Sequence, residues 1–112
     1  MKDRYLFKGK EKDSGKWLEW NAIGGIPHDA TILTDTICRC TGLKDKNGNL
    51  IWENDIVKIN NSKLNTLITF RDFEIICTIP SEKYYKHRLE YDTEYEVIGN
   101  IFDNKELLES EE

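Results

Sequence analysis

Residues 41–57 read TGLKDKNGNLIWENDIV, and this stretch decides the fold of the chain. Two apolar runs flank a polar turn that contains Asn47-Gly48, the strongest short-range signal for a β-hairpin. A second polar turn, Glu53-Asn54-Asp55, reverses the chain into a further strand at 56–59. The stretch therefore predicts two successive reversals that fold the middle of the chain into antiparallel ribbons.

The N-terminal part of the chain predicts a second hairpin. Residues 4–8 and 16–20 are strand-like, and the polar segment between them contains the turn sequence Asp13-Ser14-Gly15. Residues 21–30 carry glycine, proline, asparagine and aspartate, which are typical of a loop. Residues 31–41 are rich in β-branched side chains and predict a strand.

The C-terminal part predicts three more strands, at 67–70, 73–79 and 95–102. Gly99 lies inside the last of these and indicates either a bulge or a close approach of another backbone segment. Residues 81–94 fit a helix and a long loop equally well, because tyrosines alternate there with many charged residues. Over the whole chain we expect about six or seven short strands.

The chain is expected to end in a short helix. Asp103 followed three residues later by Glu106 has the charge pattern of a capping box. The predicted fold class is therefore mainly β: a small antiparallel β-barrel or curved sheet, SH3-like in character, with an N-terminal hairpin and a short C-terminal helix. We expect a single domain over 1–112, divided into a hairpin and loop at 1–30, a β core at 31–103, and a helix with an acidic tail at 104–112.

The charge balance limits the classes of partner. The 112 residues include 16 basic and 21 acidic side chains, for a net charge of −5. A surface that binds duplex nucleic acid usually needs a basic excess, so nucleic acid is an unlikely partner on this ground. The basic residues that cluster at all are interleaved with acidic ones, which predicts a solvated face of mixed charge: Lys8, Lys10, Lys12 and Lys16, and later Lys83, Lys86 and Arg88.

The sequence predicts a cytoplasmic protein. No apolar run follows the opening residues, as a secretory signal would require. No window approaches the roughly 20 apolar residues that a membrane span needs. The three cysteines lie inside apolar segments, which predicts buried and reduced thiols.

Three blocks of the chain carry a family resemblance. Residues 41–59, TGLKDKNGNLIWENDIVKI, resemble the signature TGL-KDKNG-K-IYEGDIV of the YopX-like phage protein family. Residues 5–21 and 95–108 are similar to the opening and closing blocks of the same family. The resemblance implies a phage or prophage origin and suggests homo-oligomeric assembly. It implies no reaction.

The chain departs from this family pattern at two places. Asn54 stands where members usually have glycine, which predicts a turn position with a positive φ angle, since asparagine tolerates that conformation. Cys38-Arg39-Cys40 stands where members often read Gly-Gln-Tyr.

Cysteine and histidine side chains provide the first candidate chemistry. Cys38, Cys40, Cys77 and His28 would be the ligands of a zinc site, but one residue between two cysteines is a poor spacing for zinc. Cysteines at 38 and 40 of a strand point to the same side, which suits packing, so no metal and no cofactor are expected. His28-Asp29 resembles half of an acid–base pair without a nucleophile spaced to complete it.

Carboxylates provide the second candidate chemistry. Asp45, Glu53 and Asp55 invite a metal or two-carboxylate hypothesis, but turn formation explains them better, because each lies in or beside a predicted turn. The residues that we expect to build the turns are Asn47, Gly48, Glu53, Asn54 and Asp55. Gly24-Gly25 lacks the strand and helix that a phosphate-binding loop requires.

Aromatic residues suggest the function. We expect Trp17 or Trp20 in the core, and we expect protein contacts from Trp52, Tyr84, Tyr85 and Tyr91, because tyrosine and tryptophan are enriched at interfaces. The favoured hypothesis is a non-enzymatic protein-interaction module that binds copies of itself or a host protein. The alternative is a small-barrel nucleic-acid-binding protein of phage DNA metabolism, in which aromatic rings stack on bases. A small hydrolase or metal enzyme is a third possibility.

Overall fold

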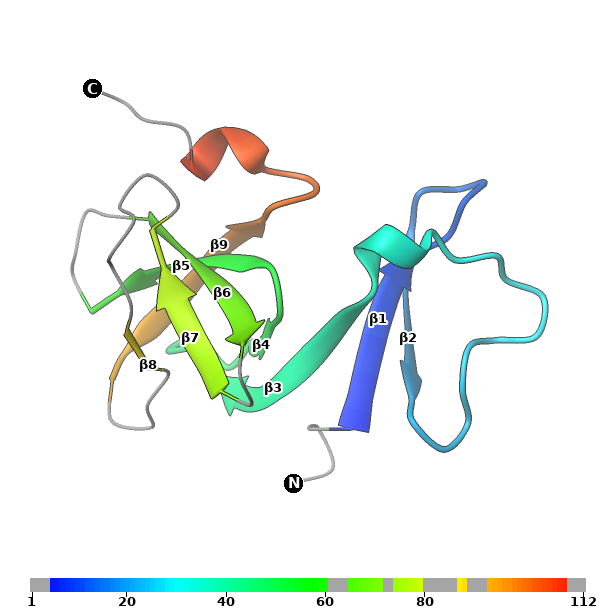
Figure 1. Ribbon diagram of the computed structural model, residues 1–112, viewed down its shortest axis with the longest axis horizontal. Helices are drawn as coiled ribbons and strands as arrows, with labels where there is room; N and C mark the ends of the chain where they lie inside the picture. The colour runs from blue at the N-terminus through cyan, green and yellow to red at the C-terminus, as the bar shows by residue number, and fades with distance from the viewer. Residues whose placement is uncertain (1–4, 61–64, 72–73, 80–86, 89–92, 109–112) are drawn as a thin grey trace.

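A computed structural model describes residues 5–60, 65–71, 74–79, 87–88 and 93–108 (Figure 1). The chain forms two antiparallel sheets, one with strand order β2-β1-β3-β4 and one with order β8-β7-β6-β5-β9. The elements bounded within the described residues also include the short 3-10 helices η2 (Thr34–Thr36) and η3 (Lys105–Leu108). The strands are β1 (Leu6–Lys10), β2 (Trp17–Asn21), β3 (Cys38–Lys44), β4 (Leu50–Trp52), β5 (Asp55–Ile59), β6 (Asn65–Arg71), β7 (Glu74–Thr78), β8 (His87–Arg88) and β9 (Tyr95–Asn100).

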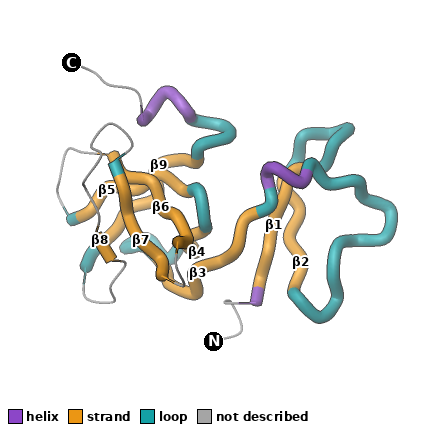
Figure 2. Tube along the Cα trace, in the orientation of Figure 1, coloured by secondary structure: helices purple, strands orange, loops and turns teal. Residues whose placement is uncertain are grey.

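The mainly β fold class is confirmed, and it takes the form of curved sheets. Among the described strands the five-stranded sheet ends at β8 and β9, which do not pair to close a barrel. Figure 2 shows the two sheets side by side, with β3 running from the N-terminal hairpin to the five-stranded sheet. The expected β core at 31–103 is therefore shared between both sheets, because β3 and β4 extend the sheet of the hairpin. In the part of the chain that is described, no helix is long and apolar enough to span a bilayer.

The predicted N-terminal hairpin is confirmed. β1 and β2 pair in antiparallel register from Leu6 opposite Asn21 to Lys10 opposite Trp17. The alternation of side chains gives the hairpin two faces. The rings of Phe7 and Trp20 stack on one face, with centroids 6.4 Å apart, and the other face carries Lys10 and Trp17 toward the second sheet.

The strand predicted at 31–41 exists only from Cys38 onward. Residues Thr34–Thr36 form the short 3-10 helix η2 instead. The hydroxyl of Thr36 donates to the carbonyl of Leu33 (2.6 Å) and accepts from the backbone N–H of Lys10 (2.8 Å). The Thr36 hydroxyl thus satisfies backbone groups of Leu33 and Lys10 that strand pairing would otherwise satisfy. The chain can therefore bend before it enters β3.

The first three residues of the central stretch form a bulge in β3. Cys40 pairs with Trp52 and Lys44 with Leu50, so the register shifts between these pairs. Gly42 has φ +85°, a conformation that is costly for residues with a side chain. The bulge bends β3 and lets it serve both sheets.

The first reversal of the central stretch is confirmed. β3 and β4 form a hairpin in which the N–H of Gly48 donates to the carbonyl of Asp45 (3.0 Å). The N–H of Asp45 in turn donates to the carbonyl of Asn49 (2.7 Å). The hairpin turn thus forms where the Asn47-Gly48 dipeptide predicted it.

The second reversal does not form the expected ribbon. β4 pairs with β3, whereas β5 pairs with β6 and β9, so the turn at 53–54 carries the chain from one sheet to the other. Asn54 has φ +73°, which confirms its predicted positive-φ conformation. Its N–H donates to the carbonyl of Ile68 in β6 (2.8 Å) rather than back to β4.

β4 lies between two hydrophobic clusters and contributes alternate side chains to each. Ile51 belongs to the core of the five-stranded sheet, together with Val57, Ile68, Cys77 and Tyr95. Trp52 belongs to a second cluster with Cys38 and Cys40, against which Leu6, Trp17, Leu50 and Phe102 pack. Period-two alternation in a three-residue strand therefore joins the two halves of the molecule.

The bulge predicted at Gly99 is confirmed, and the close neighbour of the glycine is a side chain instead of a backbone segment. Ile56 pairs with Gly99 and Val57 with Val97, so one residue of β9 has no partner in β5. A Cβ atom at position 99 would lie 2.6 Å from Oδ1 of Asn104. The turn after β9 therefore packs directly on the glycine.

The predicted C-terminal helix is a single 3-10 turn, η3 (Lys105–Leu108). The N–H of Leu107 donates to the backbone carbonyl of Asn104 (2.9 Å). The capping box predicted at Asp103 is wrong, because the carboxylate of Asp103 bonds to the N-terminal hairpin instead.

The ambiguous region 81–94 is described only at 87–88 and 93–94. Residues His87–Arg88 form β8, which pairs with β7, so these two residues adopt neither the helix nor the loop that we considered. Tyr84, Tyr85 and Tyr91 lie outside the described residues, and their predicted protein contacts stay predictions.

Candidate functional site

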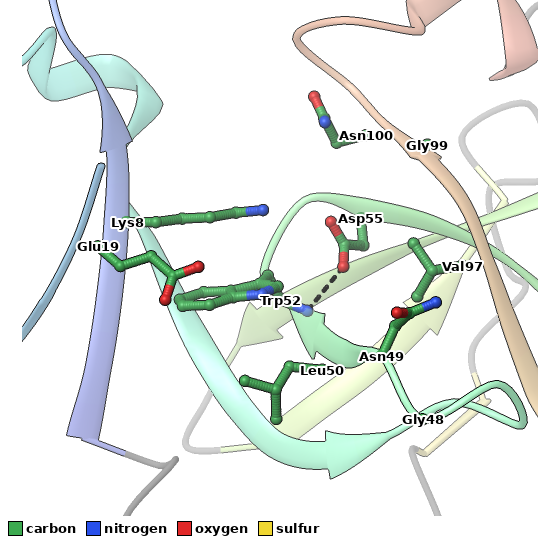
Figure 3. A pocket seen from close by; sticks show the side chains of 10 residues that line it. All are labelled: Lys8, Glu19, Gly48, Asn49, Leu50, Trp52, Asp55, Val97, Gly99 and Asn100. Atoms are coloured by element: carbon green, nitrogen blue, oxygen red, sulfur yellow. Dashed lines mark hydrogen bonds between the residues drawn. The ribbon is translucent and has the colours of Figure 1, made fainter. Parts of the chain in front are cut away.

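An open cleft of about 390 Å³ lies between the hairpin and the five-stranded sheet. The hairpin contributes Lys8 and Glu19, and the central stretch and β9 contribute the other walls. Figure 3 shows the ten lining residues: Lys8, Glu19, Gly48, Asn49, Leu50, Trp52, Asp55, Val97, Gly99 and Asn100. Half of these come from the stretch 41–57 that carries the family resemblance.

Lys8 is held in the cleft by two indole rings. Its ammonium nitrogen lies 4.7 Å from the ring centroid of Trp17 and 4.8 Å from that of Trp52. A cation over the face of an indole is stabilised by the ring quadrupole. No carboxylate of the described residues forms an ion pair with Lys8.

Asp55 is the buried carboxylate of the cleft, with 3% of the residue exposed. Its Oδ2 atom accepts the backbone N–H of Trp52 (2.8 Å), while Oδ1 has no hydrogen-bond partner among the described residues. Burial raises the pKa of Asp55 to about 6, although the Trp52 N–H and the charge of Lys8 act in the opposite direction. Figure 3 shows the Asp55 carboxylate and the Lys8 ammonium directed toward each other.

Asp45 lies beside the cleft and ties the hairpin turn to β9. One carboxylate oxygen accepts the N–H groups of Asn47 and Asn49, and the other accepts the N–H of Val97, all at 2.9 Å. Burial by itself would raise the pKa of Asp45, but these backbone donors lower it below its ordinary value. The N–H of Lys46 also donates to the carbonyl of Tyr95 (2.8 Å), so the turn covers the edge of β9.

Glu53 stabilises the corner between the sheets. Its Oε1 atom accepts the N–H of Arg39 (3.1 Å) and lies 3.6 Å from Nε of the same residue. Asp45, Glu53 and Asp55 therefore bond to three different sets of backbone groups. Within the described ranges, no three histidine, cysteine or acidic residues gather closely enough to hold a metal ion.

Asp103 joins the end of β9 to the N-terminal hairpin. Its carboxylate pairs with the ammonium of Lys10 and accepts Nε1–H of Trp17 (2.9 Å) and Nδ2–H of Asn100 (3.2 Å). The bond to Lys10 is the main reason that the pKa of Asp103 falls to about 2. Lys10 and Trp17 lie 93 and 86 residues away in the sequence, so no local sequence signal predicted these contacts.

The buried, reduced cysteines are confirmed. Cys38, Cys40 and Cys77 are all buried and unbridged. Burial raises the pKa of the Cys38 thiol and raises that of Cys77 to about 12, so neither thiol is activated as a nucleophile. His28 is an exposed loop residue.

A comparison of the chain with models of protein families covers all three blocks of sequence that carry the resemblance. The family model described as "YopX protein" matches residues 2–109. The chain belongs to the YopX family. A comparison with curated proteins finds no match. The family blocks of this YopX protein supply the turn, the bulge and the inter-sheet corner described above.

Trp52 of this YopX protein is not the exposed anchor that the sequence suggested. Only 5% of the residue is exposed, because its ring packs in the cluster with Cys38 and Cys40 and under Lys8. Packing against β3, which the sequence did not reveal, overrides the general preference of tryptophan for interfaces.

The exposed apolar side chains lie in a different part of this YopX protein. Within the described residues, large exposed hydrophobic side chains occur at Tyr5 (62% exposed), Ile23 (98%), Ile26 (46%) and Leu33 (42%). We call these four residues the N-terminal surface. All belong to the hairpin and the loop that follows it, and sequence reasoning missed them because the glycine, proline and aspartate of that segment indicated only a loop.

Proposed function

We propose that this YopX protein is a non-enzymatic protein-interaction module of phage or prophage origin. It acts in the cytoplasm of a bacterial host, where it associates through its N-terminal surface with copies of itself and with a host protein. The carboxylates that invited a catalytic hypothesis serve the geometry of turns and sheet edges in this proposal.

The observation that supports the proposal is that, among the described residues, the large exposed hydrophobic side chains all belong to the N-terminal hairpin and to the loop that follows it. Exposed apolar side chains gathered in one region mark interaction sites, since their transfer out of water contributes roughly 25 cal/mol per Å². Ile23 and Tyr5 lie at the same end of the hairpin, because the N–H of Ala22 donates to the carbonyl of Tyr5 (2.9 Å). β2 is also the outer strand of its described sheet, and an outer strand presents backbone groups that another chain can pair with.

Light scattering of the purified protein tests self-association. We expect a mass above the 13.2 kDa of one chain, and we expect the double variant Tyr5→Ser/Ile23→Ser to return to that mass. Ala22→Ser is the matched control, because it changes an exposed neighbour and removes little apolar area. A wild-type mass of one chain at every concentration would refute self-association.

Affinity capture from host lysate tests the second partner. We expect a host protein that is retained by the wild type and by Ala22→Ser and is lost with the double variant. Equal retention by all three proteins would count against the N-terminal surface as the binding site.

A further inference from the structure

The cleft holds two charged side chains, each with one polar atom that has no hydrogen-bond partner in the described part of the molecule. Lys8 Nζ contacts only ring faces, and Asp55 Oδ1 has no donor, within the described part of the molecule. They do not pair with each other within 4 Å, although the charge of Lys8 favours the ionised form of Asp55. A donor and an acceptor therefore face the same cavity across a gap.

The other polar side chains of the cleft are already used or solvated. The side chain of Asn49 is exposed, and the backbone N–H of this residue donates to Asp45 Oδ1 (2.9 Å). Asn100 accepts the N–H groups of Phe102 and Asp103 (2.9 Å each). Glu19 is exposed at the mouth of the cleft. The chemistry of a bound group is therefore set by Lys8 and Asp55.

A ligand group that fits both residues must accept a hydrogen bond from Lys8 Nζ and donate one to Asp55 Oδ1. A cationic group would meet the ammonium of Lys8, and an anionic group would meet the carboxylate of Asp55. A primary carboxamide is neutral, and it carries two N–H donors beside a carbonyl acceptor.

We infer that the cleft binds a primary carboxamide, whose N–H donates to Asp55 Oδ1 and whose carbonyl accepts from Lys8 Nζ. Leu50, Val97 and the ring of Trp52 supply apolar walls for an attached aliphatic chain. The volume of about 390 Å³ accommodates either a free small amide or a glutamine side chain of a partner. This site lies apart from the N-terminal surface, so the inference does not depend on the proposed function.

Three small probes of nearly equal shape distinguish the charge types. In an NMR titration of the ¹⁵N-labelled full chain, acetamide, acetate and acetamidinium present a neutral, an anionic and a cationic group. We expect saturable shifts of the backbone amides of Trp52 and Asn49 with acetamide, and at least tenfold weaker effects with the two ions. Absence of saturation by acetamide, or tighter binding of either ion, would overturn the inference.

Two further probes distinguish the sources of the amide. The methylamide of N-acetylglutamine is compared with the corresponding glutamate and lysine derivatives. Tighter binding of the glutamine derivative than of acetamide would indicate a polypeptide side chain, and equal binding would indicate a free amide. Preference for the glutamate or lysine derivative would refute the carboxamide assignment.

Variants test the two contacts separately. Lys8→Met keeps an aliphatic chain between the indoles and removes the donor, while Asp55→Asn keeps an acceptor for the Trp52 N–H and turns a donor toward the ligand. Since a hydrogen bond to a charged group is worth about tenfold or more in affinity, each variant should weaken acetamide binding by about tenfold. Asp29→Asn changes an exposed loop residue that does not line the cleft, and this control should bind as the wild type does. Unchanged affinity in both folded variants, judged by their spectral dispersion, would contradict the inference.

Discussion

Replacing Asp45 by alanine should separate the hairpin turn from the five-stranded sheet. The carboxylate of Asp45 accepts three backbone N–H groups at 2.9 Å, two from its own turn and one from Val97 in β9. The side chain is buried, so alanine leaves the N–H of Val97 facing a small void.

The cost can be worked out from these three bonds. A hydrogen bond to a charged group contributes about 1.5–3 kcal/mol, and we assign this value to the half-buried N–H of Val97. The N–H groups of Asn47 and Asn49 belong to exposed residues that water reaches, so each loses about 0.5–1 kcal/mol. We therefore expect Asp45→Ala to reduce the free energy of unfolding by about 2.5–5 kcal/mol, a large share of the total for a small domain.

Urea denaturation at pH 7, followed by tryptophan fluorescence and circular dichroism, measures this loss. Asp45→Asn keeps one carbonyl oxygen for the turn but points an amide donor at Val97, so its loss should be smaller, about 2–3 kcal/mol. Asp29→Ala changes an exposed loop aspartate and should stay within about 0.5 kcal/mol of the wild type. An Asp45→Ala protein within about 1 kcal/mol of the wild type would refute the reasoning that this carboxylate joins the two sheets.

Three other substitutions test neighbouring contacts. Asp103→Asn should lose about 1 kcal/mol at pH 7, a value reduced for the 37% exposure of the side chain. Because the pKa of Asp103 is lowered to about 2, this stabilisation is fully present above the ordinary pKa of aspartate and is lost as the pH falls through about 2. Urea titrations of both proteins at pH 7 and at about pH 2 would show this loss. Asp55→Asn should be more stable than the wild type by up to about 3 kcal/mol at pH 8 and equal at pH 4, since a raised pKa means that ionisation above about 6 opposes folding; no gain at pH 8 would contradict the buried charge. Gly99→Ala should lose about 1–3 kcal/mol in thermal unfolding, because its Cβ would meet Asn104 at 2.6 Å, whereas Gly24→Ala, with its nearest neighbour at 3.4 Å, should be close to neutral.

The features that sequence reasoning predicted correctly depend on local chemistry. The Asn47-Gly48 hairpin, the positive φ of Asn54 and the bulge at Gly99 each follow from the conformational preferences of a few neighbouring residues. The buried cysteines follow from the apolar segments around them. In each case the physical cause lies within a few positions of the residue.

The features that it missed depend on contacts between distant segments. The turn at Asn54 leads into another sheet because β5 finds β6 and β9 as partners, and nothing within the turn specifies that choice. Asp103 resembles a helix cap in the sequence, but Lys10 and Trp17 compete for its carboxylate in the folded chain. The burial of Trp52 likewise requires Lys8 and β3 to pack around it.

The central claim, association through the N-terminal surface, is tested most directly by amide hydrogen exchange at low and high protein concentration. The account predicts slower exchange at high concentration in β2 and in the loop that carries Ile23 and Ile26, with unchanged exchange in β6 and β7. Identical exchange at both concentrations, or slowing confined to the five-stranded sheet, would contradict it.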